Sequence, residues 1–243
     1  VLHNPDEEIS SIHSEPWILE EAKKAAYVLV CESARADGSL VNRRKGSATF
    51  GLHFHGIASH AGNDPEKGRS AVVEMAHWIL ELGKHNDYAN GTSLTIGLVK
   101  GGSASNVVPE YAEATLDLRF WDNNKYDEIK ALLDKLAAKP FVDGVKVEVR
   151  VQAKKPAMVM NAGTEKLMHF VEAAGKKIGL PITWQAVGGG SDANVTSAHG
   201  IPSLDGFGPI GACFHSDKEY LEIDSIEQRV ALLKATIEEI AAA

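Results

Sequence analysis

The chain has 243 residues, of which 44% are hydrophobic and 24% are charged. Its 25 basic and 33 acidic residues give a formal net charge of −8, which argues against a nucleic-acid partner and against an anionic membrane surface. No apolar run approaches the roughly 20 residues of a membrane-spanning helix, so we expect a globular protein of one large or two smaller domains.

The first part of the chain, residues 1–45, mixes short helical and strand patterns. The opening "VLHNPDEE" resembles the end of a buried strand that enters a loop, so we expect further sequence upstream of Val1. Pro16 suits the first turn of a helix, and "AYVLVCE" predicts a fully buried strand that ends at Glu32. The polar, turn-rich stretch that follows, residues 33–47, predicts a hinge into a different domain.

The middle part, residues 46–153, follows a βαββαβ order. Strands are predicted over 47–56, 93–102, 111–121 and 144–153, and amphipathic helices over 65–85 and 123–139. The first helix carries an apolar stripe at helical spacing, formed by Ala71, Val72, Met75, Ile79 and Leu82. This order is that of a ferredoxin-like unit, which we expect to fold as an inserted domain.

The last part, residues 154–243, alternates helices and strands again. Helices are predicted over 164–178 and 225–243, and strands over 181–187 and 201–208. Between these strands, "GGGSDANVTSAHG" predicts a glycine loop that leads into a short helix. The alternation predicts a mostly parallel α/β sheet, which residues 154–243 form together with residues 1–45.

Four residues of the types that bind divalent metal ions lie in loops that follow predicted strands. They are Glu7, Glu8, Glu32 and His215, and zinc-like ions prefer carboxylate oxygen and imidazole nitrogen. Because loops at the carboxyl ends of parallel strands meet in one crevice, these side chains are expected to converge. Each also has a plainer interpretation, as a solvated turn, a turn cap or a surface histidine.

The adjacent pair Glu7 and Glu8 has a mechanistic use. Neighbouring side chains point in different directions, so one carboxylate can bind a metal ion while the other faces the metal-bound water. The metal lowers the pKa of that water, and the free carboxylate accepts its proton. The pair therefore predicts a general base beside a metal ligand.

Six stretches occur in one order along the chain: "NPDEEIS", "CESA", "GIASHAGNDPEKGRSAV", "GGSASNVVPEYAEATLDLRF", "VGGGSDAN" and "FHSDKEYLEI". Together they resemble the dinuclear zinc carboxypeptidases of the glutamate carboxypeptidase (carboxypeptidase G) type, which are related to acetylornithine deacetylases, succinyl-diaminopimelate desuccinylases and aminoacylases. The resemblance spans essentially the whole chain. It implies a partial α/β catalytic domain, residues 1–45 and 154–243, interrupted by a ferredoxin-like lid that mediates dimerisation, residues 46–153.

In the catalytic part, the resemblance implies a role for each acidic candidate. Glu7 matches the general base. Glu8 and His215 match ligands of one zinc ion, and Glu32 matches a ligand of the second. The family also has an upstream histidine and a bridging aspartate that are absent here, so the chain alone is expected to bind metal weakly and to be inactive.

In the lid, His60 matches a histidine that reaches the active site of the partner subunit and stabilises the oxyanion. Asn106 and Arg119 match polar groups that contact substrate, since a planar guanidinium suits a carboxylate. The backbone wall beside the substrate carboxylate is matched by Gly189, Gly190 and Ser191. Plainer interpretations remain: His60 suits a turn beside Gly62, Arg119 follows Asp117 at strand spacing, and the glycines suit a flexible turn.

The resemblance implies a homodimeric, zinc-dependent hydrolase that cleaves an amide bond next to a free carboxylate in a small peptide. Two zinc ions complete such a site, and cobalt or manganese can substitute in oxygen-rich sites. One alternative is an N-acyl amino acid deacylase of the acetylornithine deacetylase type. Another is a non-catalytic dimerisation fragment, which the missing upstream ligands favour.

Two cysteines, Cys31 and Cys213, lie far apart without a metal-type spacing. They predict two buried free thiols in a reducing compartment, which favours the cytoplasm. The first residues lack the basic start and apolar segment of a signal peptide. A signal peptide upstream of Val1 would change this prediction.

Overall fold

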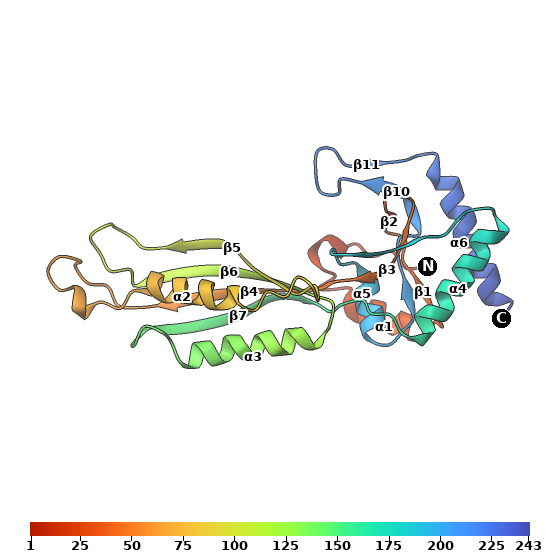
Figure 1. The fold of residues 1–243 in the computed structure, drawn as a ribbon. Helices are drawn as coiled ribbons and strands as arrows, with labels where there is room; N and C mark the ends of the chain where they lie inside the picture. The colour runs from red at the N-terminus through yellow and green to blue at the C-terminus, as the bar shows by residue number, and fades with distance from the viewer. The chain divides into compact units, whose positions relative to one another are not determined.

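The computed structural model describes all residues from Val1 to Ala243, and its helices and strands are labelled in Figure 1. The chain divides into two compact units. Unit 1 comprises Val1–Gly46 and Lys155–Ala243, and unit 2 comprises Ser47–Lys154. None of the helices combines the length and the apolar character that crossing a membrane requires.

Unit 2 is built on a four-stranded sheet. Its strands are β4 (Gly46–His55), β5 (Ser93–Gly101), β6 (Tyr111–Phe120) and β7 (Lys146–Lys155), in the spatial order β5-β6-β4-β7. A short 3-10 turn, η2 (Pro65–Lys67), precedes helix α2 (Ala71–Gly83), and helix α3 (Asn124–Ala138) connects β6 to β7. This strand order and the βαββαβ sequence are the predicted ferredoxin-like arrangement.

One face of this sheet is covered and the other is open. Along β6, every second residue is buried: Ala112, Ala114, Leu116, Leu118 and Phe120. Both helices contact β6, and the period of two places their contacts on a single face. The residues between them are half-buried or exposed, so the second face carries polar side chains.

Helix α2 supplies the largest side chain of this core. Trp78 is fully buried and meets Phe54 of β4 edge to face, with the ring centroids 5.5 Å apart. Of the predicted stripe, Ala71, Met75 and Leu82 are buried, whereas Val72 and Ile79 are half-buried. Trp78 shifts the buried face of the helix by a fraction of a turn, because its bulk fills the space that those two residues were expected to fill.

Unit 1 contains three small groups of paired strands. β1 (Val28–Leu29) runs parallel to β9 (Ser203–Leu204), and β3 (Leu40–Arg44) runs parallel to β8 (Trp184–Val187). β10 (Gly208–Ala212) runs parallel to β2 (Ser33–Ala34) and antiparallel to β11 (Tyr220–Leu221). The chain is therefore a mixed α/β protein with parallel and antiparallel pairing, and the fold class predicted from the sequence is confirmed.

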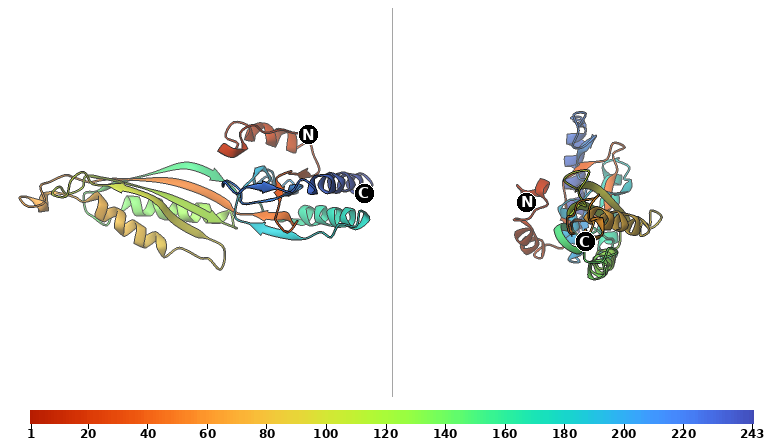
Figure 2. Two further views of the ribbon diagram at one scale, coloured as in Figure 1. Left: turned by 90° about the horizontal axis from the view of Figure 1, so that it is seen from above. Right: turned by 90° about the vertical axis from the view of Figure 1, so that its left-hand side faces the viewer.

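The helices of unit 1 are α1 (Glu15–Ala22), α4 (Ala162–Lys177), α5 (Asp192–Ala198) and α6 (Ser225–Ala241), with a 3-10 turn η1 (Glu7–Ile9). α4 and α6 lie side by side, as the views in Figure 2 show. They enclose an apolar cluster that includes Leu40, Leu167, Val171, Phe207 and Leu232. This cluster fixes β3 and the loop after β9 against the two helices.

Several expectations for unit 1 were wrong. The predicted buried strand is only two residues long and half-buried, because β1 has one neighbour, β9, and a strand paired on one side is not enclosed. Val1 is exposed and belongs to no strand. The predicted hinge contains β2 and β3. Cys31 and Cys213 are free as predicted, but both are exposed.

Candidate functional site

The acidic segment that carries Glu7 and Glu8 forms a single 3-10 turn, η1. Glu7 is half-buried and Glu8 is exposed. The two residues after the turn, Ser10 and Ser11, have φ angles of 71° and 53°. A left-handed conformation costs about 1–2 kcal/mol for a residue with a Cβ atom, so other contacts must hold this segment in place.

Asp6 is one of the groups that hold the acidic segment. Its carboxylate accepts hydrogen bonds from Ser14 Oγ and, at 2.9 Å, from the backbone N–H of His13. These bonds, that from Ser14 first, lower the pKa of the Asp6 carboxyl from its usual value. Asp6 therefore serves the local structure of the segment and leaves the two glutamates to face outward.

Glu32 follows β1 and is partly buried. Burial raises the pKa of its carboxyl, and the nearby carboxylates of Asp205 and Glu7 raise it further. Arg44 opposes this effect, and Asp192 adds to it. Glu32 therefore lies near Glu7, and the carboxylates that raise its pKa outnumber the one cation, Arg44, that lowers it, which is a local excess of negative charge. A bound cation would relieve that excess.

Lys155 is a site residue that the sequence analysis missed. Its Nζ lies 3.0 Å from Glu7 Oε1, and its side chain is only 10% exposed. It also borders the glycine loop, since a Cβ atom on Gly190 would lie 2.8 Å from Lys155 Cδ. The only sequence signal was a lysine at the end of a predicted strand. As the structure stands, one oxygen of Glu7 is occupied by this ammonium group.

A buried ion pair holds the glycine loop, residues 188–191. Arg44 Nε donates to Asp205 Oδ2 at 2.7 Å, and Arg44 Nη1 donates to the carbonyl of Gly189 at 2.9 Å. Asp205 also accepts hydrogen bonds from Ser191 Oγ and, at 2.6 Å, from Gly206 N. Arg44 and Asp205 are both buried, so this network sets the orientation of the loop backbone. The sequence analysis did not identify either residue.

Ser191 ends the loop and begins helix α5. Its side chain accepts from Ala193 N at 3.2 Å, and its N–H donates to Asn194 Oδ1 at 2.9 Å, which is a reciprocal capping arrangement. Asn194 Nδ2 donates in turn to the carbonyls of Lys45 and Pro156, at 3.1 and 2.8 Å. The loop that was expected to be a substrate wall is therefore ordered by side chains on both sides.

His215 lies in the loop between β10 and β11. It has a φ of 61°, as has Cys213, and its N–H donates to Glu219 Oε2 at 3.0 Å. Phe214 between them lies under the guanidinium of Arg35, 4.7 Å from the ring centroid. The four residues other than glycine with positive φ thus occur only here and after Glu8. Strained backbone often marks functional segments.

A complete metal site is not assembled. No group of three or more histidine, cysteine, aspartate or glutamate side chains is placed to share a metal ion. The predicted ligands Glu8, Glu32 and His215 therefore do not converge on one point in this structure. The donor types fit a divalent cation, but the number of ligands that converge does not.

In unit 2, the structure places His60 and Asn106 side by side. His60 forms a bridge with Val107, and Ala61 N donates to the carbonyl of Asn106 at 2.9 Å. His60 Nδ1 accepts from the N–H groups of Gly62 and Asn63, both at 3.1 Å. In the neutral imidazole the proton is therefore on Nε2, which leaves an exposed N–H donor.

Arg119 lies elsewhere in unit 2. It lies near the last residue of β6, whereas the loop that carries His60 lies near the first residue, Tyr111. An extended strand of this length separates Arg119 from Tyr111 by roughly 27 Å. Its guanidinium binds Asp117 with two bonds, of 2.8 and 2.9 Å. The plainer interpretation, a strand charge paired at a spacing of two, describes this contact. A substrate carboxylate would have to compete with Asp117.

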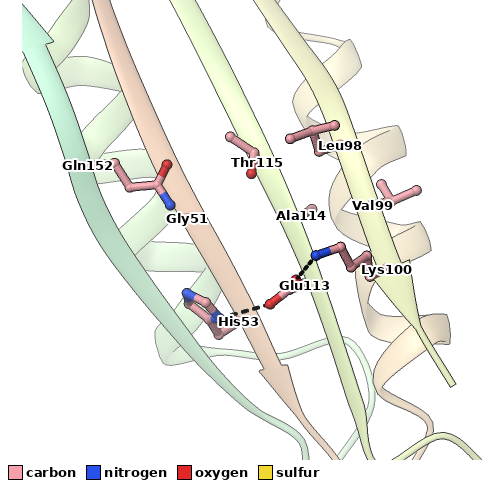
Figure 3. A pocket seen from close by; sticks show the side chains of 9 residues that line it. All are labelled: Gly51, His53, Leu98, Val99, Lys100, Glu113, Ala114, Thr115 and Gln152. Carbon is pink, nitrogen blue, oxygen red and sulfur yellow. Dashed lines mark ion pairs between the residues drawn. The ribbon is translucent and has the colours of Figure 1, made fainter. Parts of the chain in front are cut away.

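A shallow pocket lies on the open face of the sheet of unit 2 (Figure 3). Glu113 lies between Lys100, with a 3.2 Å ion pair, and His53, at 4.0 Å. The lining consists of Gly51, His53, Leu98, Val99, Lys100, Glu113, Ala114, Thr115 and Gln152. None of the site residues predicted from the sequence is among them, so this pocket is separate from the candidate site.

Comparisons with known proteins bear on both units. Residues 42–145 match the peptidase dimerisation domain family. The chain is 33% identical to carboxypeptidase G2 of Pseudomonas sp. (strain RS-16), over 100% of this chain and 59% of that protein. It is 29% identical to a succinyl-diaminopimelate desuccinylase of Psychrobacter arcticus, over 98% of this chain and 61% of that protein.

Among solved structures, aminopeptidase PepT from Bacillus cereus ATCC 10987 has a TM-score of 0.76 at 27% identity, over 94% of this chain and 62% of that one. The chain is therefore similar to α/β peptidases, and its residues 42–145 match the peptidase dimerisation domain family. The chain is homologous to carboxypeptidase G2 and to succinyl-diaminopimelate desuccinylase. The family resemblance predicted from the motifs is confirmed. The chain spans 59% of the length of carboxypeptidase G2.

Proposed function

We propose that the natural full-length protein is a metal-dependent hydrolase that cleaves an amide bond next to a free carboxylate, as a glutamate carboxypeptidase does. The observation that carries this proposal is the acidic centre in unit 1, where burial, and then the nearby carboxylates of Asp205 and Glu7, raise the pKa of the partly buried Glu32. Carboxylates gathered in this way can bind a divalent metal ion, which activates a water molecule for hydrolysis, and perturbed pKa values are frequent at such sites. The similarity to carboxypeptidase G2 supports the same reaction class.

In this proposal Glu7 is the general base. It accepts a proton from the attacking water and later delivers that proton to the leaving amine. Because Lys155 Nζ lies 3.0 Å from Glu7 Oε1, the ammonium must give up this contact or share it when substrate binds. Lys155 is suited to that exchange, since a substrate carboxylate offers it an equivalent partner.

Zinc is the proposed cofactor, with Glu8, Glu32 and His215 as ligands from this chain. Their oxygen and nitrogen donors fit zinc, and cobalt or manganese would also fit. Bound there, the metal would supply an activated water. Among the described residues, no group of three such ligands converges on one point.

Unit 2 has the roles of a lid and a dimerisation domain in this proposal, and unit 1 those of the catalytic domain. His60 donates from Nε2 to the developing oxyanion in the site of a partner subunit, and Asn106 lies beside it. Arg119 binds a substrate carboxylate. The separation of His60 from Arg119 along β6 supports their action in different subunits of a homodimer.

The test replaces Glu7 by glutamine in the natural full-length protein. We expect the turnover of an N-acyl-glutamate substrate to fall about 10²- to 10⁴-fold, because general-base catalysis is lost. Metal content should stay unchanged, since Glu7 is not a proposed ligand. Glu20→Gln, at an exposed position on α1, serves as the matched control and should leave turnover unchanged. Turnover within tenfold of the parent in Glu7→Gln would remove Glu7 from this role.

A deacylase is the second candidate. The desuccinylase of Psychrobacter arcticus matches 98% of this chain, and the same acidic centre would serve that reaction. The two candidates differ in which side of the amide bond the site grips. Comparing acyl-glutamates, small dipeptides and N-acyl diamino acids as substrates separates them. If none of these is cleaved by the metal-loaded full-length protein, a non-catalytic role in dimerisation is favoured.

A further inference from the structure

Asp192, the first residue of helix α5, binds two residues from the opposite end of the sequence. Its Oδ1 accepts from Ser11 Oγ at 2.5 Å, and its Oδ2 accepts from Asn4 Nδ2 at 2.6 Å. Both carboxylate oxygens are thus used by the segment that carries Glu7 and Glu8. Helix α1, which follows this segment, also contacts α5.

Asn4 cannot reverse its side-chain amide. Its Oδ1 accepts from Asp6 N at 3.0 Å, within its own segment. The Nδ2 group therefore has to face outward, where it donates to Asp192 and, at 2.9 Å, to Ser11 Oγ. This arrangement gives the contact a direction: residue 4 donates and residue 192 accepts.

Ser11 is the second anchor point. It is completely buried, although residues on both sides of it are exposed. Its φ of 53° lies in the left-handed region, which a serine adopts only when other contacts hold it there. The charge-assisted bond from Ser11 Oγ to Asp192 is a contact of that kind. The bond therefore fixes the residue where the acidic segment reverses direction.

We propose that Asp192 is a positioning residue that holds the Asn4–Ser14 segment, and with it Glu7 and Glu8, against the start of α5. Asp192 directly follows the glycine loop, so one carboxylate sets the distance between the acidic segment and that loop. The consequence for catalysis rests on the proposed function. The anchor itself rests only on the contacts of Asn4, Ser11 and Asp192.

An exchange of the two side chains tests the anchor. In Asp192→Asn, only one side-chain oxygen remains at position 192, so the new amide cannot accept from both Asn4 Nδ2 and Ser11 Oγ, and Asn4 cannot turn to compensate. In Asn4→Asp, two carboxylates face each other. In the double variant Asn4→Asp/Asp192→Asn, the amide of residue 192 donates to the carboxylate of residue 4, and the bond from Asp6 N to residue 4 is kept. Ser11 Oγ can still donate to residue 192 but no longer accepts from residue 4. Net charge in the double variant equals that of the parent.

The first readout is amide hydrogen exchange of peptides that cover residues 4–14 in the natural full-length protein. We expect each single exchange variant to accelerate exchange about tenfold or more, and the double variant to return within about threefold of the parent. Ser11→Ala, which removes one anchor bond without a change in charge, should give a smaller acceleration. Asp224→Asn, at an exposed position with no side-chain cap bond, is the control and should change nothing.

The second readout is turnover of the same variants. We expect kcat to fall at least about tenfold in Asp192→Asn with KM changing much less, and to recover in the double variant, because a misplaced base slows the chemical step. Two results would contradict the anchoring role of Asp192. One is an unchanged rate of hydrogen exchange at residues 4–14 in Asp192→Asn, and the other is a double variant whose exchange is as fast as in the single variants. A parent protein without amidase activity would overturn the proposed function and leave the exchange result to decide the anchor.

Discussion

In unit 2, strands of nine or ten residues form one sheet, whereas the strands of unit 1 are two to five residues long. Long strands present whole apolar faces to helices, so unit 2 is stabilised chiefly by burial of alternate side chains such as Leu116 and Leu118. The short strands of unit 1 cannot do this alone. Buried polar contacts, such as the Arg44–Asp205 ion pair, connect them to their surroundings.

The proposed function offers a reason for this difference. A site that gathers carboxylates such as Glu7 and Glu32 in one place opposes folding, because like charges repel and desolvation penalises them. Its segments must be held by specific partners, and in unit 1 these partners come from distant parts of the sequence. Unit 2 has no such demand on its core, and regular alternation suffices there.

Breaking the buried ion pair of unit 1 should have the largest effect on stability. Arg44→Met leaves Asp205 buried without its cation, and we expect the free energy of unfolding to fall by about 3–5 kcal/mol. Urea unfolding measures the loss, and hydrogen exchange should place it in β3, β8 and the glycine loop. The strands of unit 2 should keep their protection, because Arg44 and Asp205 both belong to unit 1.

The matched control for Arg44→Met removes both charges. In Arg44→Met/Asp205→Leu, neither partner is left as an unpaired buried charge, so much of the lost stability should return. Ser191 and Gly206 lose an acceptor in this variant, so recovery should be incomplete. A double variant that is less stable than Arg44→Met would show that Asp205 acts mainly as a hydrogen-bond acceptor for these two residues.

A cavity in the sheet core of unit 2 should have the next largest effect. Leu116 is fully buried on the helix-covered face of β6, and Leu116→Ala should cost about 3 kcal/mol through lost burial and an unfilled cavity. Loss of protection from hydrogen exchange should appear in β5, β6 and α2. Thr115→Ala, on the open face of the same strand, is the control, and a similar cost there would contradict a core on one side only.

A smaller effect is expected from the one buried carboxylate of α2. Glu74 Oε1 accepts from Trp78 Nε1 at 2.9 Å, and Oε2 accepts from Val142 N at 2.6 Å. Glu74→Gln replaces one acceptor by a donor that faces another donor, so we expect a loss of about 1–3 kcal/mol in unfolding free energy. Glu81→Gln, in an exposed pair with Lys84 on the same helix, should cost about 1 kcal/mol or less.

Much of unit 2 was predictable because its signals are local. The period of two along β6 and the helical period along α2 each extend over ten or more residues, long enough to be read without knowledge of the partners. The order βαββαβ then restricts the topology to few choices. The identity of the buried residues was less certain, since Trp78 and Glu74 replaced two expected members of the stripe.

In unit 1, the candidate site was only partly predictable. Glu7 and Glu32 were predicted as site residues from local stretches, "NPDEEIS" and "CESA", although no strand precedes Glu7 in the structure. Arg44, Lys155 and Asp192 were missed, because each acts on a residue more than a hundred positions away. A charged residue in a polar stretch looks like solvated surface until its partner is known. The structure supplied these long-range pairings, which no local pattern contains.

The smallest expected effect has the opposite sign. Burial and neighbouring carboxylates raise the pKa of Glu32 in the folded state. Above the pKa of the unfolded state, the charged Glu32 therefore lowers the free energy of unfolding. Below that pKa, Glu32 is protonated in both states and this loss of stability disappears. In metal-free protein, Glu32→Gln should therefore raise the melting temperature near about pH 7, and the gain should vanish toward about pH 4.

Exposed Glu110→Gln is the control, and its melting temperature should match that of the parent at both pH values. Added zinc should reverse the order, because the parent then gains a ligand that binds only the folded state. A lower melting temperature of Glu32→Gln without metal would show that this carboxylate stabilises unit 1, and would contradict the contrast between the charged site of unit 1 and the apolar core of unit 2.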